Sequence, residues 1–115
     1  MKRLEYSQIA RQKIKELKID LSQKFGLSFA KKSIKRMTTA VRRLEQFADS
    51  GVQIAEMYDI DTDYWYIFVN HNYFVYRVED EKVIVVQIFN EKEDFMQKLF
   101  GISGRTQESI EYWGE

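Results

Sequence analysis

The sequence has no cysteine, no proline and a single histidine, His71, in 115 residues. Without cysteine the chain has no disulfide, no thiolate metal ligand and no cysteine nucleophile. One histidine excludes metal sites built from several histidines, and a Ser-His-Asp triad would depend on His71 alone. Without proline, the turns must rely on glycine, asparagine, aspartate and serine. We expect no cofactor and no metal site.

Long apolar runs are also missing. The longest run, Tyr64–Val69, is far shorter than the ~20 residues that cross a bilayer, and the first residues lack the apolar stretch of a signal peptide. We therefore expect a cytoplasmic protein with no membrane partner. The length suits one core, so a single domain is expected over residues 1–115.

The net charge of zero hides two halves of opposite charge. Residues 1–50 carry 13 basic and 5 acidic residues, a net charge of +8, whereas residues 51–115 carry 5 basic and 13 acidic residues, a net charge of −8. A basic first half fits a polyanion-binding face, with Lys31, Lys35 and Arg42 as candidate nucleic-acid contacts. It equally fits helices that are solvated or that dock on an acidic element, so both interpretations stay open.

Two stretches of helical period occupy the first half. Ser7 is a candidate N-cap for a helix that ends at Gly26, where glycine adopts a positive φ cheaply. Ser28 is the candidate N-cap of a second helix, which runs to Ala48 and stops at residues 49–51. The two-residue connection at Gly26 and Leu27 predicts an antiparallel helical hairpin.

After residue 51 the hydrophobic period changes from 3.6 to 2. Residues 64–69, 73–78 and 83–89 are rich in β-branched and aromatic side chains and predict strands. Residues 52–57 and 2–6 are weaker strand candidates. The short turns at residues 70–72 and 79–82 require antiparallel pairing.

The strands are apolar on both faces, so the C-terminal segment or a partner protein must cover the face that the hairpin leaves free. Residues 90–100 predict a third helix ending at Gly101, and Thr106 is expected to cap a short turn with Ile110 and Trp113. The expected fold is α+β: an N-terminal helical hairpin packed on a three- to four-stranded antiparallel sheet, with a C-terminal helical segment.

Residues 72–94 carry a resemblance to a known family. They comprise an aromatic-rich strand containing Tyr76, an acidic turn, a Val/Ile-rich strand and a short polar stretch ending at Asp94. This pattern, preceded by a short strand and a basic helical hairpin, resembles the RelE/ParE toxin superfamily over roughly residues 2–98. The resemblance implies a toxin of a type II toxin–antitoxin system, whose partner is a small antitoxin.

The superfamily contains two activities. One branch cleaves mRNA on the ribosome without a metal, and the other poisons DNA gyrase without nuclease chemistry. The resemblance places an arginine of the cleaving branch at the position of Tyr73. Arg77 lies four residues later on the same face of the strand, and Lys92 is the basic residue that remains after the last strand. Tyr73, Arg77 and Lys92 are therefore the catalytic candidates if the chain is an endoribonuclease.

Several parts of that cleavage site are missing or reversed in charge. Glu93 stands where a second cation is expected, and Leu99 and Phe100 stand where a tail tyrosine is expected. A carboxylate there repels a scissile phosphate, and loss of one such electrostatic contact costs about 10²–10³ in rate. The preferred hypothesis is a ParE-like toxin that inhibits growth by binding a cellular target, DNA gyrase or the ribosome. A cognate antitoxin strand or helix, laid on the apolar surface, neutralises it.

Two alternatives remain open beside this hypothesis. The first is a ribosome-dependent mRNA endoribonuclease. The second is a non-toxic nucleic-acid-binding domain that uses the basic helical hairpin.

Overall fold

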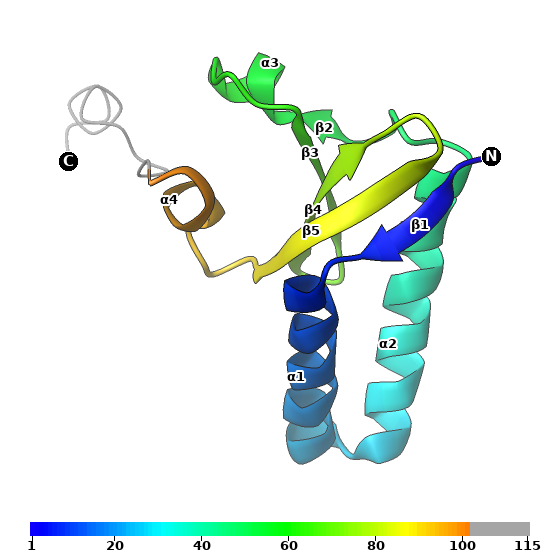
Figure 1. The fold of residues 1–115 in the computed structure, drawn as a ribbon. Helices are drawn as coiled ribbons and strands as arrows, with labels where there is room; N and C mark the ends of the chain where they lie inside the picture. Colours follow the sequence, from blue (N-terminus) through cyan, green and yellow to red (C-terminus); the bar gives the residue numbers. More distant parts are fainter. Residues whose placement is uncertain (102–115) are drawn as a thin grey trace.

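The computed structural model describes residues 1–101 (Figure 1). In chain order the elements are β1 (Arg3–Tyr6), α1 (Gln8–Phe25), α2 (Leu27–Arg42), the 3-10 helix η1 (Arg43–Glu45), β2 (Val52–Gln53), α3 (Ile54–Tyr58), β3 (Tyr64–Val69), β4 (Asn72–Val78), β5 (Lys82–Asn90) and α4 (Phe95–Phe100). The α+β class is as expected. The turn expected around Thr106, Ile110 and Trp113 lies outside the described residues. None of the helices in residues 1–101 is long and apolar enough to span a membrane.

The sheet is larger than expected and is mixed. Its five strands lie in the order β1-β5-β4-β3-β2. β1 runs parallel to β5, with Leu4 opposite Val83, and the other neighbours are antiparallel. The weak strand candidate at residues 2–6 is thus a strand, and it pairs the start of the chain with β5, 79 positions later.

A bulge interrupts β5. Val75 of β4 pairs with Gln87, whereas the next residue, Tyr76, pairs with Val85, so Val86 is an extra residue in β5. Such an extra residue reverses which side chains of the strand point to each face. Val83, Val85 and Ile88 accordingly face the helical hairpin, and Phe89 faces the opposite side.

Ser7 joins three elements at this bulge. Its backbone N–H donates to the Val85 carbonyl at 2.9 Å, and its hydroxyl donates to the Val86 carbonyl at 2.6 Å. The same hydroxyl oxygen accepts the Ala10 N–H at 3.0 Å, which caps α1. The predicted N-cap is confirmed, and it also binds the strand.

The hairpin turn is tighter than predicted. Gly26 alone connects α1 and α2, with φ 94° and ψ 160°, a conformation that essentially only glycine adopts. Because α2 begins at Leu27, Ser28 lies within the helix, and its prediction as an N-cap is wrong. α2 also ends at Arg42, before Ala48. The Ala48 carbonyl accepts the Tyr76 hydroxyl at 2.8 Å, so this segment is bound to the sheet and does not continue the helix.

Two other boundaries differ from the sequence-based prediction. Residues 52–57 form only the two-residue strand β2 and then α3, because Ile54 turns into the core and the Ala-Glu-Met run favours a helix. The third helix begins at Phe95, where the predicted range began at residue 90. Asn90 is still paired with Asn72 in the sheet, and the Asp94 side chain caps α4 through the Gln97 N–H.

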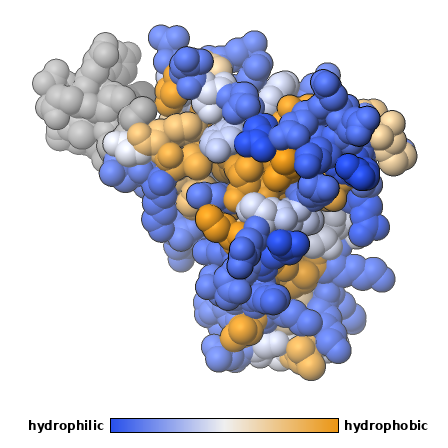
Figure 2. Space-filling model, viewed as in Figure 1, coloured by the Kyte–Doolittle hydropathy of each residue, from blue (hydrophilic) through white to orange (hydrophobic). Residues whose placement is uncertain are grey.

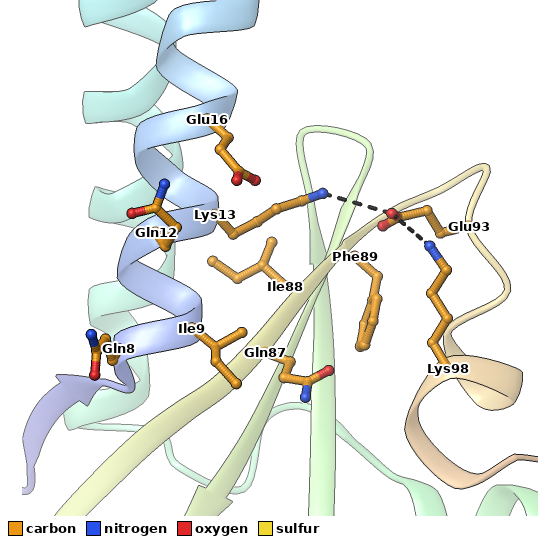
Figure 3. A pocket seen from close by; sticks show the side chains of 10 residues that line it. All are labelled: Gln8, Ile9, Gln12, Lys13, Glu16, Gln87, Ile88, Phe89, Glu93 and Lys98. Carbon is orange, nitrogen blue, oxygen red and sulfur yellow. Dashed lines mark hydrogen bonds and ion pairs between the residues drawn. The ribbon is translucent and has the colours of Figure 1, made fainter.

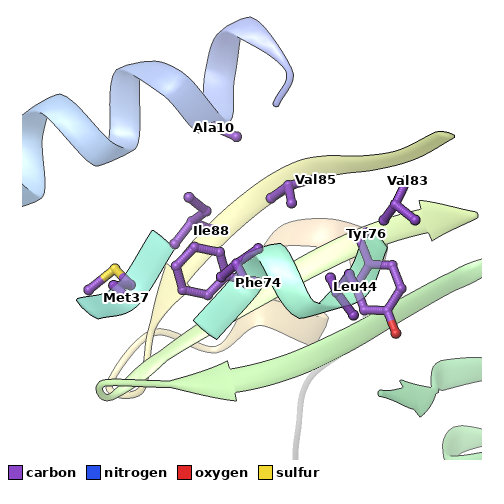
Figure 4. Close-up of a cluster of buried hydrophobic side chains, with 9 residues drawn as sticks. Ala10, Met37, Leu44, Phe74, Tyr76, Val83, Val85 and Ile88 are labelled. Atoms are coloured by element: carbon purple, nitrogen blue, oxygen red, sulfur yellow. The ribbon is translucent and has the colours of Figure 1, made fainter. Parts of the chain in front are cut away.

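Two apolar cores hold the layers together. The first lies between the hairpin and the sheet, and Figure 4 shows it. Its buried members are Ala10, Met37, Val41, Leu44, Phe74, Tyr76, Val83, Val85 and Ile88. The second lies on the opposite face, where α3 and α4 contribute Ile54, Phe95 and Met96 against the sheet. α4, together with α3, therefore covers the second face.

Tyr76 fastens the chain before β2 to the centre of the sheet. Its side chain is fully buried, and its hydroxyl accepts the Gly51 N–H at 3.1 Å while it donates to Ala48. Burial raises the pKa of Tyr76 to about 12, although the Gly51 N–H opposes the shift, so the hydroxyl keeps its proton. A Cβ on Gly51 would lie 2.6 Å from the Tyr66 carbonyl oxygen, so only glycine fits there.

The Ser7→Ala variant tests the junction at the bulge. It removes the α1 cap and the Ser7 hydroxyl that donates to the half-buried Val86 carbonyl, so we expect the free energy of unfolding to fall by about 1–3 kcal/mol. Urea denaturation measures this. Ser28→Ala is the matched control, because Ser28 is exposed and makes no capping hydrogen bond. An equal loss in both variants would contradict the junction.

Candidate functional site

A groove runs between α1 and the outer edge of β5 (Figure 3). Its volume is about 470 Å³. Ile88 and Phe89 of β5 form its floor, Ile9 and Lys13 stand on the α1 side, and the segment after β5 closes the far end. Ile9 is 62% exposed, so the groove offers apolar surface to solvent. In Figure 2, hydrophobic surface gathers in the middle of the view, where α1, β5 and α4 approach one another.

The groove lies beside an open strand edge. β1 pairs with β5 only as far as Val85, and Ser7 occupies the next carbonyl, that of Val86. Within residues 1–101 no strand pairs with the outer edge of β5 from Gln87 to Asn90. An unpaired edge next to exposed apolar side chains is a template for an added strand.

A cluster of charges closes the groove. The Glu93 carboxylate lies 3.7 Å from Lys13 Nζ and 2.9 Å from Lys98 Nζ, and it accepts the Asn90 N–H at 2.7 Å. Burial alone would raise the pKa of Glu93. The Lys98 and Asn90 hydrogen bonds and the Lys13 and Lys98 charges outweigh burial and hold that pKa below its ordinary value. Glu93 thus ties α1 to α4 and keeps its charge.

Tyr73 is packed among aromatic rings on the α4 face of the sheet. Its ring centroid lies 4.7 Å from that of Phe95, 4.9 Å from that of Phe68 and 5.4 Å from that of Tyr66. Val75 lies two residues after Tyr73 in β4, points to the same face of the sheet and belongs to the same core. Arg77 follows at the same spacing, so it shares the face of Tyr73, about 13 Å further along the strand.

The structure does not bring Tyr73, Arg77 and Lys92 into one site. Lys92 follows Asn90, which pairs with Asn72 at the start of β4, so Lys92 and Arg77 lie at opposite ends, about 17 Å apart along the strand. Both the Nε and an Nη of Arg77 donate to one oxygen of Glu79, at 3.1 and 2.8 Å. The positive charge of Arg77 is therefore balanced by Glu79, which follows the end of the same strand.

The basic candidates lie together on the hairpin. Lys31, Lys35 and Arg42 are all exposed on α2. Their spacings of four and seven residues place them along one side of that helix.

Sequence reasoning missed the groove residues Ile9, Lys13 and Phe89. The sequence feature that could have indicated the groove is Ile9, an apolar residue that falls outside the apolar period of α1. In the structure its side chain is exposed. Its place beside β5 depends on the bulge and on the parallel pairing of β1, neither of which has a pattern in the sequence.

The order of the elements agrees with the resemblance seen in the sequence. A short first strand, a basic helical hairpin and an antiparallel meander with a C-terminal helix follow one another as that resemblance implies. The family model described as the ParE toxin of the type II toxin–antitoxin system, parDE, matches residues 4–95. The chain therefore belongs to the ParE toxin family and is a toxin of the type II toxin–antitoxin class.

A solved structure supports the fold. The chain resembles one described as the chromosomal ParDE TA system from P. aeruginosa, with a TM-score of 0.67 and 15% sequence identity, over 78% of this chain and 96% of that chain. At this identity the likeness concerns the fold alone. The search of the curated proteins found no match.

Glu93→Gln tests the charge cluster. A carboxyl whose pKa is depressed by folding stabilises the native state above its unfolded pKa, and this contribution is lost as the pH falls through the folded pKa. We expect Glu93→Gln to be less stable than the wild type at pH 7. The difference should close as the pH drops below 4.5, the unperturbed value.

Thermal unfolding at several pH values measures that difference. Glu16→Gln is the control, since Glu16 lines the same groove and makes no ion pair within residues 1–101. A pH-independent effect of Glu93→Gln would contradict the assignment.

Proposed function

We propose that this toxin arrests growth by binding a cellular target without cleaving it, and that an antitoxin neutralises it by docking in the groove beside β5. The observation that carries the docking proposal is the juxtaposition of the open β5 edge with exposed Ile9. An extended antitoxin segment can pair with the backbone of this edge and place alternate apolar side chains against the exposed Ile9 on the α1 side.

The polar lining of the groove suits such a segment. Lys13 and Lys98 both point to Glu93 in Figure 3, and Glu16 lines the same groove, so its charged lining consists of two lysines and two glutamates. Polar side chains on the antitoxin can complement these alternating charges, which fix the register of the segment. The docking surface thus combines a backbone edge, an apolar floor and a charged end.

The geometry supports target binding over cleavage. RNA cleavage without a metal needs a base, an acid and cations around one phosphate. The cleavage candidates are spread over opposite ends of β4, and Arg77 is engaged by Glu79. DNA gyrase is the target implied by the non-cleaving branch, and the ribosome is implied by the cleaving branch.

Ile9→Glu tests the docking groove. Burial of an isoleucine side chain in a complex contributes about 1.5–3 kcal/mol, so its replacement by a charged residue should weaken antitoxin binding by at least about tenfold. The variant should still arrest growth but should no longer be neutralised when the antitoxin is co-expressed. Titration calorimetry with the purified antitoxin gives the affinity.

Ile19→Glu is the matched control, because Ile19 is 58% exposed on the same helix and does not line the groove. Equal effects of the two variants, or an unchanged affinity of Ile9→Glu, would contradict antitoxin docking in this groove.

Arg77→Ala separates binding from cleavage. If the toxin acts without nuclease chemistry, wild-type expression leaves transcripts intact in primer extension, and Arg77→Ala still arrests growth. Specific mRNA cleavages that vanish in Arg77→Ala would overturn the non-catalytic proposal.

A further inference from the structure

The outward side of α2 carries positive charge alone. Six cationic side chains lie on this helix and the adjoining first residue of η1, and all are exposed: Lys31, Lys32, Lys35, Arg36, Arg42 and Arg43. α2 contains no aspartate or glutamate. We call these six residues the α2 basic face.

The charges of the α2 basic face are not balanced within the described chain. The ion pairs in residues 1–101 engage other cations, such as Lys24 with Asp20 and Lys82 with Glu5, and none of the six takes part. The Tyr6 hydroxyl interacts electrostatically with Arg42, but burial raises the pKa of Tyr6 to about 12 even though the Arg42 charge lowers it. Tyr6 is therefore neutral at pH 7 and does not compensate the arginine.

The spacing of the cations suits a long, regular polyanion. Lys31, Lys35 and Arg42 form one row along α2, and Lys32, Arg36 and Arg43 form a second. With a rise of 1.5 Å per residue, each row spans about 16 Å. Duplex DNA presents one phosphate charge per ~1.7 Å of its axis, so each row can reach several phosphates. A shallow depression that includes Thr39 and Ala40 allows close approach.

We propose that the α2 basic face binds the phosphate backbone of duplex DNA. The residues that line its depression include no aromatic ring, whereas proteins that bind single strands stack bases on such rings. What the face does supply is cations, and these bind DNA phosphates without reading sequence.

This inference goes beyond the toxin function proposed above and uses a different surface. No residue of the α2 basic face lines the groove between α1 and β5. The toxin can therefore engage DNA while an antitoxin occupies the groove.

Fluorescence anisotropy with a labelled 25-base-pair DNA duplex tests the proposal on the full chain. With about 0.9 counterions released per phosphate contact, six contacts predict that wild-type affinity falls about 10³-fold between 50 and 200 mM salt. The variant Lys31→Gln/Lys35→Gln/Arg42→Gln keeps three cations, so its affinity should fall only about 40-fold over the same range. It should also bind more weakly than the wild type at 50 mM salt.

The matched control is Arg3→Gln/Lys24→Gln/Lys82→Gln, which makes the same change in net charge. Lys24 and Lys82 are paired with carboxylates, and Arg3 borders the acidic residues 79–81. This variant should keep the wild-type affinity and salt slope. Equal losses in the two triple variants would show a net-charge effect and overturn the proposal.

Three further outcomes overturn the proposal. They are no DNA binding at 50 mM salt, equal or tighter binding of an RNA duplex, and equally effective competition by polyglutamate at the same charge concentration. Growth arrest and antitoxin affinity, measured on the same variants, report on the toxin function separately. The α2 triple variant should leave the antitoxin affinity unchanged.

Discussion

The hydrogen bonds of Ser7 at the β5 bulge hold β1, α1 and β5 together, and so attach the helical hairpin to the sheet. One residue ends β1, caps α1 and occupies the Val85 and Val86 carbonyls. The bulge lets β5 serve both cores, because side chains on either side of Val86 can reach the hairpin face while Phe89 reaches α4. The junction also directs α1 across the sheet and leaves the rest of the β5 edge open. The groove is thus a by-product of how the first helix is attached.

Most of the elements could be predicted from local pattern. The bounds of β3 match the apolar run Tyr64–Val69, and α1 has the predicted N-cap and the predicted end. The turn at Asn70 and His71 has positive φ at both residues, as a two-residue hairpin requires. The incorrect predictions lie at the ends of elements, where tertiary contacts and not the hydrophobic period of the sequence determine the structure. Ser28 resembles an N-cap, but Gly26, two residues earlier, already occupies that position of α2. The predicted strand at residues 52–57 bends where Ile54 enters the second core.

The candidate site was harder to predict because its members meet only in three dimensions. From the sequence, Glu93 is interpreted as a carboxylate that repels phosphate. Its ion-pair partner Lys13 lies in the first helix and reaches Glu93 only after α1 packs on β5. The Arg77–Glu79 pair was within reach of sequence reasoning, since the two residues share a face of a strand end. The α2 basic face was visible as a charge imbalance. What the sequence lacked was evidence that all six cations are exposed and unpaired in the described chain.

The parallel pairing of β1 with β5 has a consequence for synthesis on the ribosome. Lys82, the partner of Arg3 in the sheet, is translated 79 positions after it. The nascent chain can build its helical hairpin early, but β1 cannot pair until β5 has emerged. A prematurely terminated product therefore lacks the edge of β5 and the groove beside it. Only a polypeptide that includes β5 acquires the groove between β5 and α1.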